Sequence, residues 1–168
     1  MLFSKWTLFQ GAAIFGMVSL IFIAEIFSLQ ISRILSSGPY ISFLLVLTFI
    51  LIGSSLISLF LIFHSKKSDL FLSHPLWEKM NILLAFLFIL SILIFIIVVI
   101  FTPLSDVIVT NRWILYLFIF YFLFLLNLFV LSIIHKVKRN LSKEKKIELS
   151  FVWTVLSIII LIFLIPSI

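Results

Sequence analysis

The chain has 168 residues and a formal net charge of +6; 64% of its residues are hydrophobic and only 11% are charged. Soluble domains are about half apolar and about a quarter charged, and one core of this size could not hide so much apolar surface from water. The sequence contains no cysteine, which excludes disulfides, thiolate zinc sites and iron–sulfur clusters. These figures predict a protein that lies in lipid and has no soluble domain.

Five stretches are apolar enough to cross a bilayer, which takes about 20 residues. In chain order they cover about residues 6–29, 40–63, 82–101, 113–134 and 149–168. Ser37, Gly38 and Pro39 interrupt the chain between the first two, and Pro103 follows the third. The apolar positions show neither period-two alternation nor a polar stripe, which favours buried helices over a β-barrel. The sequence therefore predicts an all-α membrane protein with about five transmembrane helices.

Lysine and arginine in the short loops predict the orientation, because they concentrate on the cytoplasmic side. One side of the predicted bundle holds only Arg33 and Arg112, and the other holds ten basic residues. These ten are Lys5, Lys66, Lys67, Lys79, Lys136, Lys138, Arg139, Lys143, Lys145 and Lys146. We therefore predict an inside N-terminus and an outside C-terminus. Charge placed in this way indicates topology and contact with lipid headgroups, and it argues against a nucleic-acid partner.

Glu25 is the one charged residue well inside a predicted span, and Asn127 is an amide in the middle of another. Glu25 lies about one turn from the outer end of the first span, where a carboxylate needs a partner or water. We expect it either to reach the headgroups, with Arg33 as ion partner, or to contact another subunit, a quinone or a proton path. Asn127 lies in the middle of the fourth span, and we expect its amide to bond to a neighbouring helix. Ligand binding is the alternative for Asn127.

Small residues are candidates for helix–helix contacts, and two histidines are candidates for ligand binding. Small residues gather at the centre of the first two spans, at Ala12, Ala13, Gly16, Gly53, Ser54, Ser55 and Ser58. They predict close helix packing there. His64 and His135 end two spans on the basic side, and we expect both to be solvated at the interface. Haem ligation between them is the alternative.

The C-terminal residues 146–168 read KIELSFVWTVLSIIILIFLIPSI. An acidic residue precedes a Trp-Thr pair, a long aliphatic run and a Pro-Ser pair, at Glu148, Trp153, Thr154, Pro166 and Ser167. This segment resembles the second transmembrane helix of subunit II of haem-copper terminal oxidases. Residues 113–134 and the basic loop after them are similar to the first helix and inner loop of that family. The resemblance implies a subunit II-like hairpin over residues 106–168, and the first three predicted spans then form a three-helix N-terminal membrane region over residues 1–105.

The match departs from the family pattern in several places. Ser150 stands three residues before Trp153, where the family often has glutamate, and Glu148 lies two residues earlier. Pro166 comes one residue sooner than usual, and Ser157 stands where the family's helix has a proline. The first three spans have no counterpart in standard subunit II.

In members of the family that oxidise cytochrome c, the helix leads into an outer domain whose Cys, His and Met side chains bind two copper ions. Because this chain lacks cysteine, the resemblance implies a subunit without that copper centre. One interpretation is a quinol oxidase with a reduced subunit II, which the extra spans favour. The other is the membrane half of a split cytochrome c oxidase subunit II.

The resemblance thus implies a non-catalytic subunit of a respiratory oxidase that reduces oxygen and translocates protons. No cofactor is expected in this chain; haem and copper would lie in its main partner, the catalytic subunit I. Other membrane subunits, lipid and a quinone are further expected contacts. The expected location is the cell membrane, or the mitochondrial inner membrane for a split subunit. Glu148 would lie near the inner mouth of a proton path, or would be a solvated charge at the start of a helix.

Two alternatives belong to other functional classes. The chain could be a structural or assembly subunit of another membrane complex, with the C-terminal match accidental. It could also be a small transporter or quinone-binding protein that uses Glu25 and Asn127.

Overall fold

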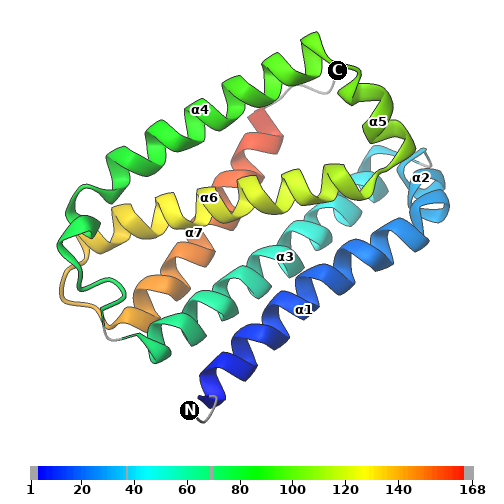
Figure 1. Cartoon of the computed structure of the whole chain (residues 1–168). Helices are drawn as coiled ribbons and strands as arrows, with labels where there is room; N and C mark the ends of the chain where they lie inside the picture. The colour runs from blue at the N-terminus through cyan, green and yellow to red at the C-terminus, as the bar shows by residue number, and fades with distance from the viewer. Residues whose placement is uncertain (1–3, 37, 69, 165–168) are drawn as a thin grey trace.

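The computed structural model describes residues 4–36, 38–68 and 70–164, and within these ranges the chain forms helices and no strand (Figure 1). The helices are α1 (Lys5–Ile26), α2 (Ser28–Ser36), α3 (Pro39–Lys67), α4 (Met80–Phe101), α5 (Leu104–Thr110), α6 (Trp113–Val137) and α7 (Lys143–Leu164), with a 3₁₀ turn, η1 (Pro75–Glu78), before α4. The all-α prediction is confirmed for this part of the chain.

Four of the helices, α1, α3, α4 and α6, are long and apolar enough to cross a membrane. They correspond to the first four predicted spans. The fifth predicted span lies on α7, whose first turns carry Lys145, Lys146 and Glu148. Its last residues, which include Pro166 and Ser167, lie outside the described residues. The number of five spans and the orientation of the termini therefore stay predictions.

Short helices that the sequence analysis did not predict connect the long ones at one end of the bundle (Figure 1). The chain turns at Phe27, so that α1 ends at Ile26 rather than at residue 29, and it continues as α2. In α2 the polar residues Ser28, Gln30 and Arg33 are interspersed with apolar ones, which is typical of a helix lying in a membrane interface. At the same end, α5 connects α4 to α6.

Two helices form the centre of the bundle: α3 packs against α1, α2, α6 and α7, and α6 packs against α1, α3, α4, α5, α7 and η1. In contrast, α4 lies at the edge and packs against α6, with further contacts to η1 and α5. The largest buried cluster consists of Ile57, Leu61, Leu72, Trp77, Phe120, Leu123, Leu131 and Ile147. Since these residues come from both α3 and the α6–α7 hairpin, the N-terminal region and the hairpin share one core. The predicted boundary near residue 105 falls within α5.

Two glycines lie where neighbouring helices are in close contact. A Cβ atom on Gly53 would lie 3.1 Å from Cε1 of Phe120 and 3.2 Å from Cδ2 of Leu123, on α6. A Cβ atom on Gly16 of α1 would lie 3.0 Å from Cδ2 of Leu56 on α3. The prediction that small residues allow these helices to approach is therefore confirmed at both positions.

The connection from α3 to α4 folds back into the core. Leu72 has a left-handed backbone (φ 64°), which costs an ordinary L-residue about 1–2 kcal/mol, and its side chain is buried in the core cluster. Burial of the leucine offsets this strain. Next, Nδ1 of His74 accepts a hydrogen bond from the backbone N–H of Leu76 at 3.3 Å, and Pro75 begins η1. This turn buries Trp77 under the bundle.

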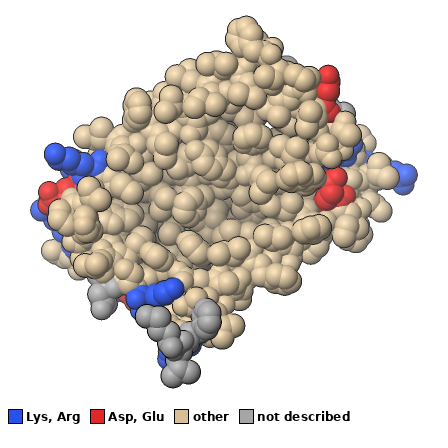
Figure 2. All heavy atoms as spheres, in the orientation of Figure 1, with Lys and Arg blue, Asp and Glu red and all other residues tan. Residues whose placement is uncertain are grey.

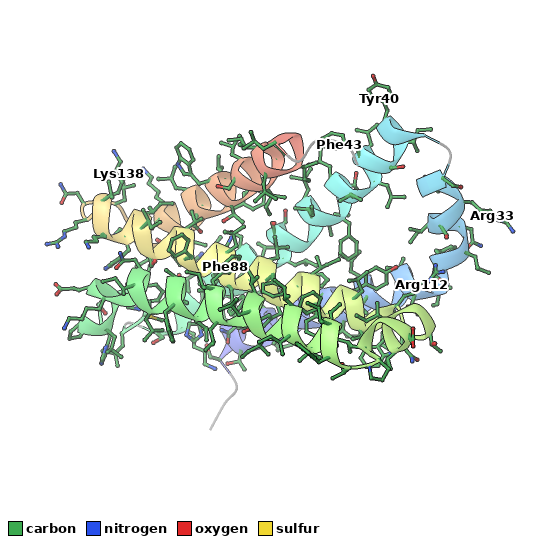
Figure 3. All side chains as sticks on the ribbon, turned by 90° about the horizontal axis from the view of Figure 1, so that it is seen from above. Arg33, Tyr40, Phe43, Phe88, Arg112 and Lys138 are labelled. Atoms are coloured by element: carbon green, nitrogen blue, oxygen red, sulfur yellow. The ribbon has the colours of Figure 1, made fainter. Side chains whose placement is uncertain are left out.

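Charged side chains lie at the two ends of the bundle, with an uncharged belt between them (Figure 2). Helix order places the ten basic residues of the sequence analysis at one end, where α1 and α7 begin and α3 and α6 end. We call this the basic end. Arg33 and Arg112 lie at the opposite end, far from Lys138 (Figure 3). The predicted segregation of charge is thus confirmed.

Candidate functional site

Five polar side chains are buried on α3, α6 and α7, three helices that pack against one another, and we call these five residues the polar layer. Ser54, Asn127, Ser150 and Thr154 are completely buried, and Ser58 is nearly so. Ser54 and Ser58 are four residues apart on α3, as are Ser150 and Thr154 on α7, so each pair lies on one helix face. The layer therefore consists of hydroxyl groups and one amide, which do not titrate near neutral pH.

One hydrogen bond within this layer joins two helices. The hydroxyl of Ser150 lies 3.4 Å from Oδ1 of Asn127, on α6, and 2.7 Å from the carbonyl oxygen of Ile147 in its own helix. A hydroxyl has a single proton to donate, so the shorter bond to Ile147 is the stronger one. The prediction that Asn127 bonds to a neighbouring helix is confirmed, through a long and weak contact.

Three polar atoms of the layer have no hydrogen-bond partner among the described residues. They are Nδ2 of Asn127, Oγ of Ser54 and Oγ1 of Thr154. A buried polar group without a partner costs about 1–3 kcal/mol. The layer therefore has unused hydrogen-bonding capacity at the centre of the bundle, but no acid or base to drive a proton-transfer step.

A double-mutant cycle measures the bond between the two helices. We expect the coupling free energy between Asn127→Ala and Ser150→Ala to be about 0.6 kcal/mol or less, the usual range for such bonds between membrane helices. Reversible unfolding in mixed detergent micelles, followed by circular dichroism, gives the four free energies that the cycle needs. A coupling above about 1.5 kcal/mol, near the largest measured for such bonds, would contradict this weak bond.

Glu25 lies at the end of the bundle opposite the basic end. Its Oε2 atom is buried and has no hydrogen-bond partner in the described part of the chain. The arginine that reaches α2 is Arg112, whose Nη1 donates to the carbonyl oxygen of Ser28 at 3.2 Å. We expected Arg33 to be the ion partner of Glu25 at the headgroups. The described side chains show no ion pair between these two residues. Both arginines lie at this end (Figure 3).

An apolar cavity of about 410 Å³ adjoins Glu25. Its other lining residues come from α1 and α6 and are Val18, Ile21, Phe22, Trp113 and Leu117. A single carboxylate in such a cavity can bond to a hydroxyl or an amine of an amphiphile. Contact with a subunit, a quinone or a proton path stays a prediction.

His64 and His135 lie at the basic end in a chain of aromatic contacts. Nδ1 of His64 is 3.0 Å from Nε2 of Gln10, which is buried on α1, so His64 is not merely solvated as expected. From His64 the ring contacts run through Phe71 and Trp77 to His135, with centroid distances of 5.0, 5.3 and 5.9 Å. Two aromatic rings thus separate the histidines, which argues against a haem held between them.

Sequence reasoning missed this cluster for a specific reason. Gln10 was overlooked because it is uncharged and lies near the start of a span. Gln10 lies near the start of α1 and His64 near the end of α3, so the two residues are at the same depth if α1 and α3 pack antiparallel. The equal depth of these two polar residues could have predicted their contact. No group of three His, Asp or Glu residues that could hold a metal ion occurs among the described residues.

Three residues of the C-terminal motif are among the described residues, and Glu148, Trp153 and Thr154 lie on different sides of α7. Glu148 is exposed at the basic end, so that it and Glu25 lie at opposite ends of the bundle. Trp153 is 55% exposed, whereas Thr154 is completely buried. Trp153 lines an apolar groove of about 460 Å³ between α6 and α7, together with Phe129, Ile133 and Leu149 among others. The structure therefore does not bring Glu25, Asn127 and Glu148 into one site.

No known protein family, curated protein or solved structure matches this chain.

Proposed function

We propose that the chain is a non-catalytic membrane subunit that docks onto a larger membrane protein through the α6–α7 hairpin. The observation that carries this proposal is the groove beside Trp153, which opens on the outside of the hairpin. An indole ring that is 55% exposed offers a large apolar contact for a partner helix. The buried polar layer supports a packing role, because it contains no acid–base pair for chemistry.

The resemblance at residues 113–168 specifies the partner that we propose. It is the catalytic subunit I of a haem-copper terminal oxidase in the cell membrane, most simply a quinol oxidase, because the chain has no cysteine for a copper centre. In this assignment the partner carries the haem and copper. This chain packs against the partner, and its charged residues at the basic end lie near the entrance of a proton path.

The test is purification of the tagged chain from its native membrane in mild detergent. Co-purification of a large partner with an a-type or b-type haem spectrum and quinol-dependent oxygen consumption would support the assignment. Electron transfer from cytochrome c instead of quinol would indicate the split-subunit alternative. A preparation with a large partner but no haem would exclude the oxidase and indicate that the chain is a subunit of another membrane complex. A preparation without any large partner would overturn the proposal.

Glu148 is the residue for a proton-entry test in that complex. We expect Glu148→Ala to slow oxygen reduction several-fold without loss of haem, because removing a general proton carrier slows delivery to the reaction. Turnover and the haem spectrum are measured on the same preparation. Glu144→Ala is the matched control, because Glu144 lies one turn earlier on α7 and carries the same charge. Equal rates in Glu148→Ala and the unchanged protein, or equal slowing in both variants, would exclude proton entry at Glu148.

A further inference from the structure

A cavity of about 500 Å³ opens at the basic end, separate from the polar layer and from the groove beside Trp153. Three elements form it: η1, the end of α6 with the loop after it, and the start of α7. Its lining residues are Glu78, Lys79, His135, Lys136, Arg139 and Lys146. Four basic side chains and one imidazole thus line the cavity together with a single carboxylate, and that carboxylate is exposed.

Lys146 is the most informative of these residues, because only 6% of it is exposed. Lysine is almost never buried unless it is paired. Its Nζ donates to the carbonyl oxygen of Arg139 at 3.1 Å, and this is the partner that the described residues provide. An ammonium group has three donors, so the remaining two are open to another acceptor. Burial lowers the pKa of the Lys146 side chain, as expected for a cation without a counter-ion.

His135 adds a second polar group without a partner. Its Nδ1 atom is buried and has no hydrogen-bond partner in the described ranges. The ring lines the cavity and contacts Trp77, with the ring centroids 5.9 Å apart. The site therefore combines an ammonium group, a guanidinium group and an imidazole, and the buried Trp77 packs against the imidazole.

We propose that this cavity binds a phosphate group. Arginine and lysine together are the donors that recognise phosphate oxygens, through forked and point-charge hydrogen bonds respectively. Basic pockets between membrane helices hold the headgroups of anionic lipids. The phosphate belongs either to such a lipid or to a small soluble molecule, and the cavity places its charge next to Lys146 and Arg139. This site does not depend on the identity of the protein partner.

The test uses the purified, delipidated chain in detergent micelles. Native mass spectrometry measures binding of short-chain phosphatidylglycerol to the unchanged protein, to Lys146→Gln and to Lys145→Gln. Lys145 is the matched control, because it is exposed, adjacent in sequence and not part of the cavity wall. We expect Lys146→Gln to weaken binding about tenfold, the loss of one charge-assisted hydrogen bond, and Lys145→Gln to leave it within about twofold.

Two further arms identify the source of the phosphate. If millimolar inorganic phosphate displaces the lipid, the site takes a soluble phosphate; if it does not, the site takes the lipid headgroup. Lys146→Arg should restore binding, since it keeps the charge. Arg139→Gln serves as a second variant should Lys146→Gln fail to fold, which thermal melting reveals.

A site-specific signal complements the binding curves. In a chain whose other three tryptophans are replaced by phenylalanine, the emission of Trp77 should change as phosphatidylglycerol is added, because its ring contacts His135. Equal weakening by Lys146→Gln and Lys145→Gln would show that only general surface charge attracts the lipid. That result, or no binding to the unchanged protein, would overturn the proposal.

Discussion

Replacing Gly53 by leucine should destabilise the bundle by about 2–3 kcal/mol, the usual penalty for overpacking a tight core. A Cβ atom alone would meet the ring of Phe120 at 3.1 Å and the side chain of Leu123 at 3.2 Å, and leucine adds three more carbons at this contact. Helices α3 and α6 would have to separate to admit them. Since both α3 and α6 pack against α7, the separation would also disturb their packing against that helix.

Unfolding of the purified protein in mixed micelles, followed by circular dichroism, measures this effect. Gly11→Leu is the matched control, because a Cβ atom on Gly11 meets nothing within 4 Å. There the better helix propensity of leucine should leave stability unchanged or raise it by less than about 1 kcal/mol. If the two variants lose the same free energy of unfolding, the close contact between α3 and α6 is not present in the folded protein.

Leu131→Ala should cost about 2–4 kcal/mol, since truncating a buried leucine leaves a cavity that its neighbours fill only partly. Leu131 is completely buried on α6 and belongs to the cluster that connects α3 with the α6–α7 hairpin. In a membrane the driving force is packing rather than exclusion of water, so the cavity accounts for most of this loss.

Leu93→Ala on α4 is the comparison for this variant. Leu93 is 52% exposed, and lipid chains can occupy the space that its side chain leaves. We expect a loss below about 1 kcal/mol on the same mixed-micelle scale. A loss as large as that of Leu131→Ala would mean that a further protein surface, rather than lipid, covers α4.

The membrane character and the long helices could be read from the sequence because hydrocarbon imposes a strict rule on length and composition. A run of about 20 apolar residues must satisfy its own backbone hydrogen bonds, and a helix does this. Gly53 and Gly16 were also readable, since small residues inside such runs mark close approaches. The short helices α2 and α5 were not, because both are shorter than a span and lie between recognisable breaks.

The candidate sites were less predictable than the fold. Asn127 was identified as a buried amide, but its distance from Ser150 depends on the rotation of α6 against α7. In a soluble protein a polar stripe would reveal which face of each helix packs inward. Here all faces are apolar, so helix rotation is not encoded in the pattern and follows from packing.

The sequence by itself determined that the chain forms helices long and apolar enough to cross a membrane, and that ten of its basic residues gather at one end of the bundle. It did so because hydropathy and the placement of charge act locally along the chain. Only the tertiary structure decided which of these basic residues is special. Lys146 reads like its exposed neighbours in sequence, yet the packing of η1, α6 and α7 buries it beside His135 and Arg139. Burial depends on segments that lie far apart in the chain. In the sequence Lys146 is one of ten basic residues that predict the orientation, and in the folded protein it is the centre of a proposed phosphate site.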